Sequence, residues 1–283
     1  MYPTDSTTPH AALRAHVSRY VQIALELPPG QTMRHQLSAF TGSVAAVLWS
    51  GQVMMDGLDA GLAPAARIPS CCMIGPLTRW HDNVIAGPLR SFCVHFTPLG
   101  ANTLLQLHGC GFHDRAVALA DLLDAALRAE ARSWADEVMH ARSFAERVAA
   151  TDRFLMRRLR GAASRLDLVA AAIARLGRSD GGGDRVSALA ADLACSERTL
   201  RRRFRDELGL PVKLFARITR FQRAHAYLQG TPGADWAGAV VRFGYVDQAH
   251  LIHDYREFAG TTPARFSPGE RFLDAALTLS ATR

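Results

Sequence analysis

The strongest chemical signal in the sequence is a group of arginines within residues 186–209. Arg198, Arg201, Arg202 and Arg205 recur at intervals of three and four residues, so a helix places them on one face. Guanidinium groups donate paired hydrogen bonds to phosphates and to guanine edges, and such a face therefore suits DNA. Lys213 is the only lysine among the 33 basic residues, so a solvated arginine face stays open as an alternative.

Two short predicted helices position these arginines. The first carries Val186, Leu189 and Leu193 as an apolar stripe, and the second carries Leu200, Phe204 and Leu208. Ser196 is a predicted N-cap and Gly209 a predicted stop for the second helix. This layout predicts a helix-turn-helix, whose second helix enters the major groove. The predicted DNA-facing residues are Arg198, Thr199, Arg201, Arg202 and Arg205.

A second unit of the same layout follows within residues 236–260. Trp236, Ala239, Val240 and Phe243 form one stripe, Gly244 makes the turn and Asp247 is a predicted N-cap. The next helix directs Leu251, Tyr255 and Phe258 inward, and Leu251 and Tyr255 lie 51 residues after Leu200 and Phe204 of the first unit. Its predicted DNA-facing residues are Gln248, Ala249, Ile252 and His253.

The segment between the two units predicts a spacer helix from Pro211 to Gly230. About 18 residues correspond to roughly 27 Å of helix. Successive major grooves on one side of B-DNA lie about 34 Å apart. The spacer therefore holds two recognition helices near consecutive grooves, and bending of the DNA supplies the remainder.

The composition and the positive net charge of the chain are consistent with a polyanionic binding partner. The chain of 283 residues has a formal net charge of +7 and 48% hydrophobic residues, and its pI is near 9.6. Residues 165–283 hold 18 basic and 13 acidic residues, whereas residues 1–125 hold 7 and 8. No run of about 18 apolar residues predicts a transmembrane helix, and the polar N-terminus does not look like a secretory signal. We therefore expect a cytoplasmic protein without a membrane partner.

Other residues resemble chemical sites only in part. The segment His108–His113 looks metal-like but offers at most three ligands, and Cys71-Cys72 is a poor geometry for a disulfide. His81-Asp82 lacks any nucleophile, P-loop or dinucleotide motif beside it. His95 is expected to line the interior of a β-barrel and to contact a ligand if that interior is a pocket. We predict no catalytic residue, metal or cofactor, and we leave open a redox role for Cys71, Cys72, Cys93 and Cys110.

The chain is expected to be a multidomain α+β protein. Residues 1–115 are rich in short strands with Gly and Pro breaks, which predict a small β-barrel or cupin-like domain for effector binding or dimerisation. Ser50-Gly51 predicts a hairpin, and the alternation in Leu89–Phe96 predicts a strand. Residues 116–163 predict a helical linker, continuous over Val117–Arg160, that packs on the barrel, on a partner subunit or on both. Residues 164–270 form the all-α DNA-binding domain, which begins with a helix over Arg165–Leu176, and residues 271–283 form a tail.

The segment from about 165 to 270 resembles the DNA-binding domain of AraC/XylS-type transcriptional regulators. The resemblance rests on residue types at matching spacing over about 100 residues: Leu189-Ala190, Ser196, Leu200, Phe204, Leu208-Gly209, Val212, Arg220, Ala224, Leu228, Val240, Phe243-Gly244-Tyr245, Gln248, Leu251, Tyr255-Arg256, Gly260, Thr262-Pro263 and Phe266. It implies two helix-turn-helix units that contact double-stranded promoter DNA. Residues 1–120 resemble, less specifically, the small effector-binding or dimerising β domains attached to such regulators, with Gly87–Gly100 typical of one lineage.

The resemblance also implies partners and leaves alternatives. It implies a small-molecule effector, contact with RNA polymerase and a homodimer. In the second unit, His253 stands where many members have Arg, Ile252 is apolar, and Asp254 adds a negative charge, so the first unit is expected to dominate DNA affinity. The alternatives are an enzyme fused to a DNA-binding domain, such as a thiol alkyl-transfer protein, and a DNA-architectural protein without an effector. The Pro-Cys-His-Arg segment of such transferases is absent from the sequence.

Overall fold

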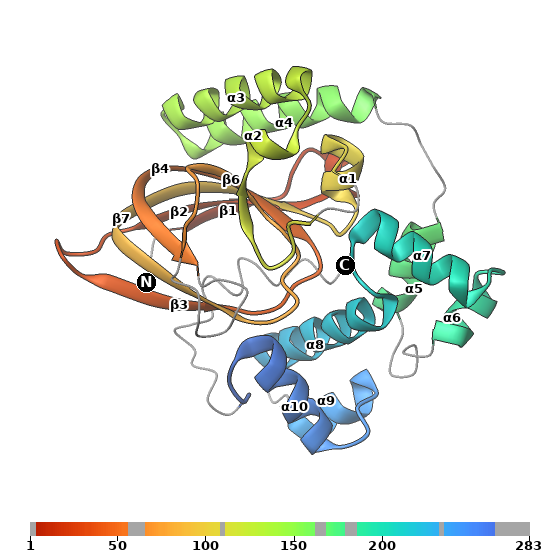
Figure 1. Ribbon diagram of the computed structural model, residues 1–283. Helices are drawn as coiled ribbons and strands as arrows, with labels where there is room; N and C mark the ends of the chain where they lie inside the picture. The colour runs from red at the N-terminus through yellow and green to blue at the C-terminus, as the bar shows by residue number, and fades with distance from the viewer. Residues whose placement is uncertain are drawn as a thin grey trace.

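The N-terminal half of the chain is an antiparallel sheet that is strongly bent (Figure 1). The computed structural model describes residues 4–55, 66–107, 111–161, 168–178, 186–231 and 235–263. The strands are β1 (Thr4–Thr7), β2 (Val17–Leu25), β3 (Thr32–Leu37), β4 (Ser43–Met55), β5 (Ala66–Arg67), β6 (Cys71–Ile74), β7 (His81–Phe96) and β8 (Ala116–Ala118). Their order is β1-β2-β7-β4-β6-β8, with β3 paired to β7 and β5 paired to β4.

The long strand β7 organises this sheet. It pairs with β4 along one edge, and along the other edge it pairs first with β3 and then with β2. The alternation predicted over Leu89–Phe96 is confirmed: Leu89 and Cys93 face a core inside the bend, whereas Phe92 and Val94 face the helices that cover the sheet. Both faces of the second half of β7 are therefore buried.

The hairpin predicted at Ser50-Gly51 is wrong. β4 runs through these residues as one strand, because both of its halves pair with β7: Val47 with Phe92, and Val53 with Ile85. The register shifts at Ser50, and the Ser50 hydroxyl donates a hydrogen bond to the carbonyl oxygen of Pro88, 2.9 Å away. Ser50-Gly51 is a β-bulge that bends the strand.

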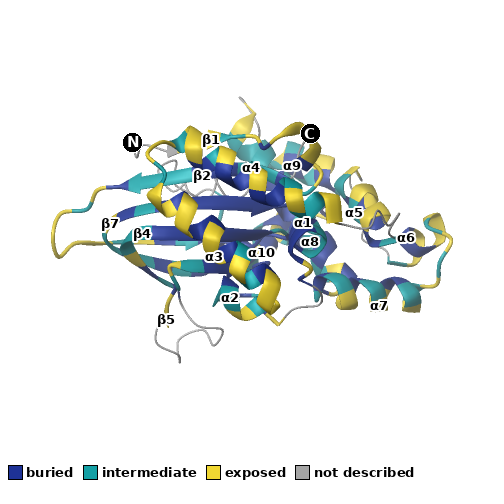
Figure 2. Cartoon of the chain, turned by 90° about the horizontal axis from the view of Figure 1, so that it is seen from above, coloured by how far each residue is buried: buried dark blue, intermediate teal, exposed yellow. Residues whose placement is uncertain are grey.

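Helices cover the outer face of the sheet. They are the 3₁₀ turn η1 (Ala11–Leu13), α1 (Gly100–Leu105), α2 (Leu119–Leu122), α3 (Ala125–His140) and α4 (Phe144–Gly161). Figure 2 shows α3 and α4 lying side by side across the strands. Trp134, Val138 and Phe154 share a core with Phe92 of β7, so this helical pair packs on the sheet. The segment Val117–Arg160, which the sequence predicts to be helical, is mostly helical, with breaks near Leu123 and Ala141, but Val117 lies in β8, where it pairs with Met73 of β6.

The C-terminal part is all helical. Its helices are α5 (Leu168–Arg178), α6 (Val186–Asp192), α7 (Glu197–Leu208), α8 (Val212–Gly230), α9 (Trp236–Phe243) and α10 (Gln248–Ala259). In Figure 1, α8 lies along the sheet, with α5, α6 and α7 grouped at one end and α9 and α10 packed below it. α5 continues one residue past Gly177, where a stop was expected, and its expected start at Arg165 lies outside the described residues.

The two groups have separate hydrophobic cores. One core joins α5, α6 and α7 to the first half of α8 and contains Phe204 and Phe215. The other joins α9 and α10 to the second half of α8 and contains Phe221, Tyr255 and Phe258. Leu214 of α8 touches both cores. Each group of helices thus has its own core on a common spacer.

Candidate nucleic-acid interface

The first unit consists of α6, a turn at residues 193–196, and α7. The Ser196 hydroxyl accepts a hydrogen bond from the backbone N–H of Thr199 at 3.1 Å, so the predicted N-cap is confirmed. Leu200, Phe204 and Leu208 are buried against the core. Gly209 ends α7 with a φ of +67°, as a C-terminal glycine is expected to do. These contacts fix which face of α7 is turned away from the protein.

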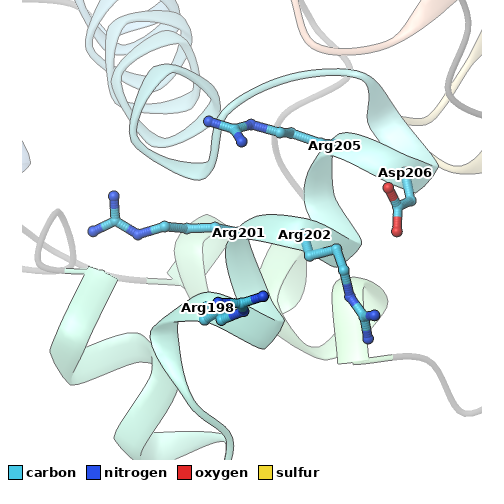
Figure 3. Close-up of a pocket in the computed structure, with 5 residues that line it drawn as sticks. All are labelled: Arg198, Arg201, Arg202, Arg205 and Asp206. Atoms are coloured by element: carbon cyan, nitrogen blue, oxygen red, sulfur yellow. The ribbon is translucent and has the colours of Figure 1, made fainter.

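That outer face carries the four predicted arginines. Arg198, Arg201, Arg202 and Arg205 are exposed, and with Asp206 they line a shallow surface pocket of about 660 Å³. Figure 3 shows Arg201 and Arg205 extending to the same side of α7, while Arg202 extends to the other side, as Asp206 does. The pocket has four cationic groups and one carboxylate. It is therefore an electropositive surface of the kind that phosphate groups bind.

Neighbouring carboxylates restrain some side chains of α7. The guanidinium of Arg201 donates to the Glu197 carboxylate at 2.6 Å, one turn earlier, and its side chain keeps 57% exposure. Arg203 donates to Glu207 at 2.6 Å and lies half-buried, away from the outer face. Thr199 is half-buried, with its hydroxyl 2.9 Å from that of Ser196 at the start of the helix. Exposed ion pairs of this type contribute little stability, so the guanidinium of Arg201 can leave Glu197 at low cost.

The second unit, α9 and α10, has the predicted caps. Asp235 accepts from the backbone N–H of Gly238 at 2.7 Å, and Asp247 accepts from that of His250 at 2.8 Å. Gly244 makes the turn with a φ of +68°. On α10, Gln248, Ala249 and His253 are exposed and Ile252 is half-buried. The outer face of α10 therefore carries one amide, one imidazole and two apolar side chains.

The sequence predicts that Asp254 adds a negative charge to this face, and that prediction is wrong. Its side chain has no exposed surface, and its carboxylate accepts hydrogen bonds from Arg217 at 2.7 Å and from Arg220 at 3.0 Å. Burial lowers the pKa of Arg217, but hydrogen bonds to Glu257 and Asp254 outweigh burial and raise the pKa above its ordinary value. The charge of Asp254 is neutralised inside the fold and does not repel DNA.

Helix α8 separates the two units. It spans 19 residues, Val212–Gly230, which corresponds to about 28 Å. Pro211 is the residue before its first turn, close to its predicted place. Arg220 of α8 also stacks on the Tyr245 ring, with 4.4 Å to the ring centroid, so the spacer contacts the turn of the second unit directly.

A small cavity lies between the sheet and the helical domain. Its volume is about 130 Å³. His95 of β7, which the sequence predicts in the interior of a β-barrel, lines this cavity between the two domains and is 3% exposed. Burial, helped by the nearby Arg19 cation, lowers the pKa of His95 to about 3. The lining residues come from both halves of the chain: Phe40, Thr41, Gly42, Ser43, Val44, His95, Phe96 and Pro98 from the first, and Ile173, Gly177, Phe215, Thr219 and Gln222 from the second.

Two buried polar groups lack partners among the described residues, one in the cavity wall and one on the strand beside His95. The Thr219 hydroxyl lines the cavity, is buried and has no hydrogen-bond partner there. Arg19 pairs with His95 across strands β2 and β7, and its buried Nη2 atom likewise has no partner in the described part of the chain. Burial lowers the pKa of the Arg19 guanidinium. Unsatisfied buried polar groups cost stability, so the Thr219 hydroxyl in the cavity wall is available to a bound molecule.

The remaining sequence signals have structural explanations. His81 is fully buried and lies 3.2 Å from the Asp114 carboxylate, an arrangement the sequence did not predict. In the segment His108–His113, residues 108–110, including Cys110, lie outside the described residues. Within the described ranges, no three histidine, cysteine or acidic side chains gather as a metal site would require. Burial raises the pKa of Cys71 to about 11 and that of Cys93 to about 12, and it also raises the pKa of Cys72, which disfavours reactive thiolates.

Comparisons with known proteins agree with this geometry. Residues 189–268 match the sequence profile of a helix-turn-helix domain family. A crystal structure of ToxT from Vibrio cholerae, with an unsaturated fatty acid bound, superimposes with a TM-score of 0.51 at 8% identity and covers 87% of this chain and 94% of that chain. A second ToxT structure, bound to (E)-4-(8-methylnaphthalen-1-yl)but-3-enoic acid, gives a TM-score of 0.50 at 8% identity, with 87% and 97% covered.

A more distant structural neighbour is CuxR, described as an AraC-like transcriptional activator. It is 14% identical, with a TM-score of 0.31 and coverage of 80% and 82%. A search of curated protein sequences gave no match. At these identities the ToxT structures show a shared fold, in which an antiparallel sheet precedes a helical domain. Across the described residues, no helix is long and apolar enough to cross a membrane.

Proposed function

We propose that this chain uses its AraC-type helix-turn-helix domain, residues 189–268, to read promoter DNA with α7 and α10 together. The chain is a DNA-binding transcription regulator. The observation that supports the reading mode is the exposed arginine face of α7, held outward by three buried residues on the opposite side of the helix. Arg198, Thr199, Arg201, Arg202 and Arg205 contact DNA from the first unit, and Gln248, Ala249, Ile252 and His253 contact it from the second.

Each group has a role set by its chemistry. Arg201 and Arg202 reach base edges, where a guanidinium recognises guanine through two hydrogen bonds. Arg205 contacts a phosphate, which fixes register without reading sequence. Gln248 recognises adenine, and the apolar Ala249 and Ile252 pack on thymine methyl groups. The first unit has four exposed cations and contributes the larger share of affinity.

The proposal is tested by the salt dependence of DNA binding by the full chain. Contacts with roughly 6–10 phosphates give a slope of about −5 to −9 for log affinity against log salt concentration. We expect a slope in that range for a duplex that the chain itself selects from random DNA. A slope near zero contradicts docking of α7 and α10 in grooves, and so does equal affinity for the selected duplex and for random DNA.

We propose further that the cavity lined by His95 holds the effector. Its walls come from the sheet and from α5 and α8, so a ligand there contacts both the sensing half and the DNA-reading half. Arg19 does not line the cavity itself, but it pairs with His95 across β2 and β7, and its buried Nη2 atom has no partner among the described residues, so this cation favours a carboxylic acid, the class of compound bound in the ToxT structures. The volume of about 130 Å³ is below the roughly 300–1,000 Å³ of pockets for drug-sized ligands, so we expect a short acid.

Thermal unfolding with a panel of carboxylic acids tests this assignment. A short acid that binds the folded chain raises Tm, and the rise follows the logarithm of its concentration above the Kd; Arg19→Met removes that shift. The amide of the same acid serves as the control ligand, because it keeps the shape and lacks the charge. An equal shift with acid and amide, or a shift that survives Arg19→Met, contradicts the carboxylate contact.

The remaining assignments extend the same proposal. Residues 1–115 sense the effector, residues 116–163 link the domains, and residues 164–270 read DNA, while the tail 271–283 lies outside the described residues. A regulator of chromosomal DNA works in the cytoplasm. RNA polymerase and a second copy of the chain stay predictions that follow from the family resemblance.

A further inference from the structure

Both DNA-reading helices end against the N-terminal domain. At the end of α7, the side-chain amide of Asn102 donates to the carbonyl oxygen of Glu207, and the His113 Nε2 atom lies 3.0 Å from the carbonyl oxygen of Leu208. At the end of α10, the backbone N–H of Ala39 donates to the carbonyl oxygen of Phe258 at 2.7 Å. The last carbonyls of a helix have no partner within the helix. Here the N-terminal domain supplies partners to both reading helices.

An aromatic ring of the N-terminal domain also covers the glycine that follows each helix. Gly209 and Gly260 both have a φ of +67°. A Cβ atom on Gly260 would lie 2.6 Å from Cδ2 of Trp80, and one on Gly209 would clash with the ring of His113. Glycine is therefore favoured at both positions for two reasons: the backbone is left-handed, and a side chain there would overlap the ring. Two corresponding points of the two units are held in the same way.

The two rings are joined to each other through Asp114. Its carboxylate accepts from the backbone N–H of Thr78 at 2.6 Å and from the Thr78 hydroxyl at 2.5 Å, and it lies 3.2 Å from Nε2 of His81. Trp80 lies between those two residues in the chain, and His113 directly precedes Asp114. Burial raises the pKa of Asp114, but hydrogen bonds from His81 and Thr78 outweigh burial and lower it. The segments that carry His113 and Trp80 are therefore connected to each other by the hydrogen bonds of Asp114.

We propose that His113 and Trp80 are positioning residues that set the spacing and angle between α7 and α10 on DNA. This inference rests on the proposed function, because it assumes that both helices read DNA. Two separate cores pack the two units, and among the described helices of the helical domain α8 is the one that contributes to both. A second connection through Asn102, His113, Asp114, Thr78 and Trp80 fixes the relative orientation that one helix alone leaves free to bend. The N-terminal domain thereby selects the distance between the two half-sites that the chain recognises.

The test measures preference for half-site spacing. The full chain first selects a duplex from random DNA, and duplexes with one base pair inserted or removed between the two protected segments are then compared. One base pair changes the separation by about a tenth of a helical turn. We expect the wild-type chain to lose roughly tenfold or more in affinity on these duplexes, the cost of one lost base contact. Trp80→Ala and His113→Ala should reduce that loss to about threefold or less.

Conservative variants separate positioning from folding. His113→Gln keeps an N–H donor and should retain most of the spacing preference, as should Trp80→Phe, which keeps a ring over Gly260. Both remain testable if an alanine variant fails to fold in a thermal unfolding scan. Arg132→Ala, on the exposed side of α3, is the matched control and should leave the preference unchanged. If folded His113→Ala and Trp80→Ala chains keep the full tenfold preference, the inference is wrong.

Failure of the proposed function gives a different result. In that case the wild-type chain selects no duplex, or Arg201→Ala binds the selected duplex as tightly as the wild type does. Failure of the inference alone leaves selection and the Arg201 dependence intact and removes only the difference in spacing preference between the wild-type chain and the His113 and Trp80 variants.

Discussion

The carboxylate of Asp254 on α10 accepts a hydrogen bond from Arg220 on α8, with 3.0 Å between Oδ2 and Nη2 and no exposed surface on the aspartate side chain. Arg217, one turn earlier on α8, donates to the other carboxylate oxygen at 2.7 Å. The second reading helix is therefore attached to the spacer helix by a buried charge cluster as well as by the aromatic core of Phe221, Tyr255 and Phe258.

Asp254→Asn should destabilise the chain strongly. The substitution leaves the two guanidinium groups beside a neutral amide, and breaking a buried ion pair from one side costs about 3–5 kcal/mol. Chemical denaturation of the full chain measures the free energy of unfolding. Asp206→Asn removes an exposed carboxylate of α7 and is the control, with an expected change within about 0.5 kcal/mol. Equal effects of the two substitutions argue against a structural charge cluster.

The arginines of α7 should divide into base readers and a phosphate anchor. Arg201→Ala and Arg202→Ala are expected to lose about 1–3 kcal/mol of discrimination at one or two base pairs. Arg205→Ala should weaken binding to selected and random duplexes alike. Affinities measured against single-base variants of the selected duplex show which behaviour each variant has, with Arg132→Ala as the charge-matched control. Uniform weakening by all three variants makes α7 an electrostatic anchor that reads no sequence.

Ile252 should contact a thymine methyl group. It is half-buried at the edge of the outer face of α10, next to the exposed Ala249. Replacing the contacted thymine by uracil removes one methyl group, and burial of such a group is worth about 0.8 kcal/mol, or roughly fourfold in affinity. Uracil should weaken binding by the wild-type chain at that position and have no further effect on Ile252→Ala. A uracil effect that persists in the variant places the contact on another residue.

His95 should make stability depend on pH already between pH 7 and pH 5, where most carboxylates are still ionised. Its folded-state pKa is about 3, below the ordinary value of 6.5, so the unfolded chain binds the extra proton first as pH falls. The stability that neutral His95 provides is therefore present above pH 6.5 and is lost as pH falls toward 3. The expected loss approaches about 1.4 kcal/mol per pH unit once the unfolded histidine is protonated. Denaturation between pH 7 and pH 5 should show a smaller decline for His95→Gln than for the wild-type chain.

Local sequence signals predict the helical domain well. Leu200 and Phe204, and again Leu251 and Tyr255, lie one turn apart, and the caps at Ser196 and Asp247 are confirmed because a cap depends only on residues three positions away. The Ser50-Gly51 bulge illustrates the opposite case. A Ser-Gly dipeptide is compatible with a hairpin turn or with a β-bulge. Which of the two forms depends on whether the residues on both sides of it pair with β7, and that is not a local property of the sequence.

Contacts between residues that are distant in the chain could not be predicted from the sequence. Asp254 looks like a surface charge until Arg217 and Arg220, more than 30 positions earlier, are brought against it. His113 was part of a metal-like segment, whereas its ring covers Gly209, and Trp80 carried no signal at all. The sequence did contain one indication. Gly209 and Gly260 occupy the same position after each reading helix, and a glycine allows another group to approach the backbone closely.

Footprinting of the selected duplex tests the central claim, that α7 and α10 read consecutive grooves, most directly. The wild-type chain should protect two segments whose centres lie about one helical turn apart. Gln248→Ala should lose protection only over the segment that α10 contacts, and Arg201→Ala should weaken protection over the whole site because the first unit carries most of the affinity. A single protected segment for the wild-type chain, or complete loss with Gln248→Ala while Arg201→Ala still protects the site, would contradict the account.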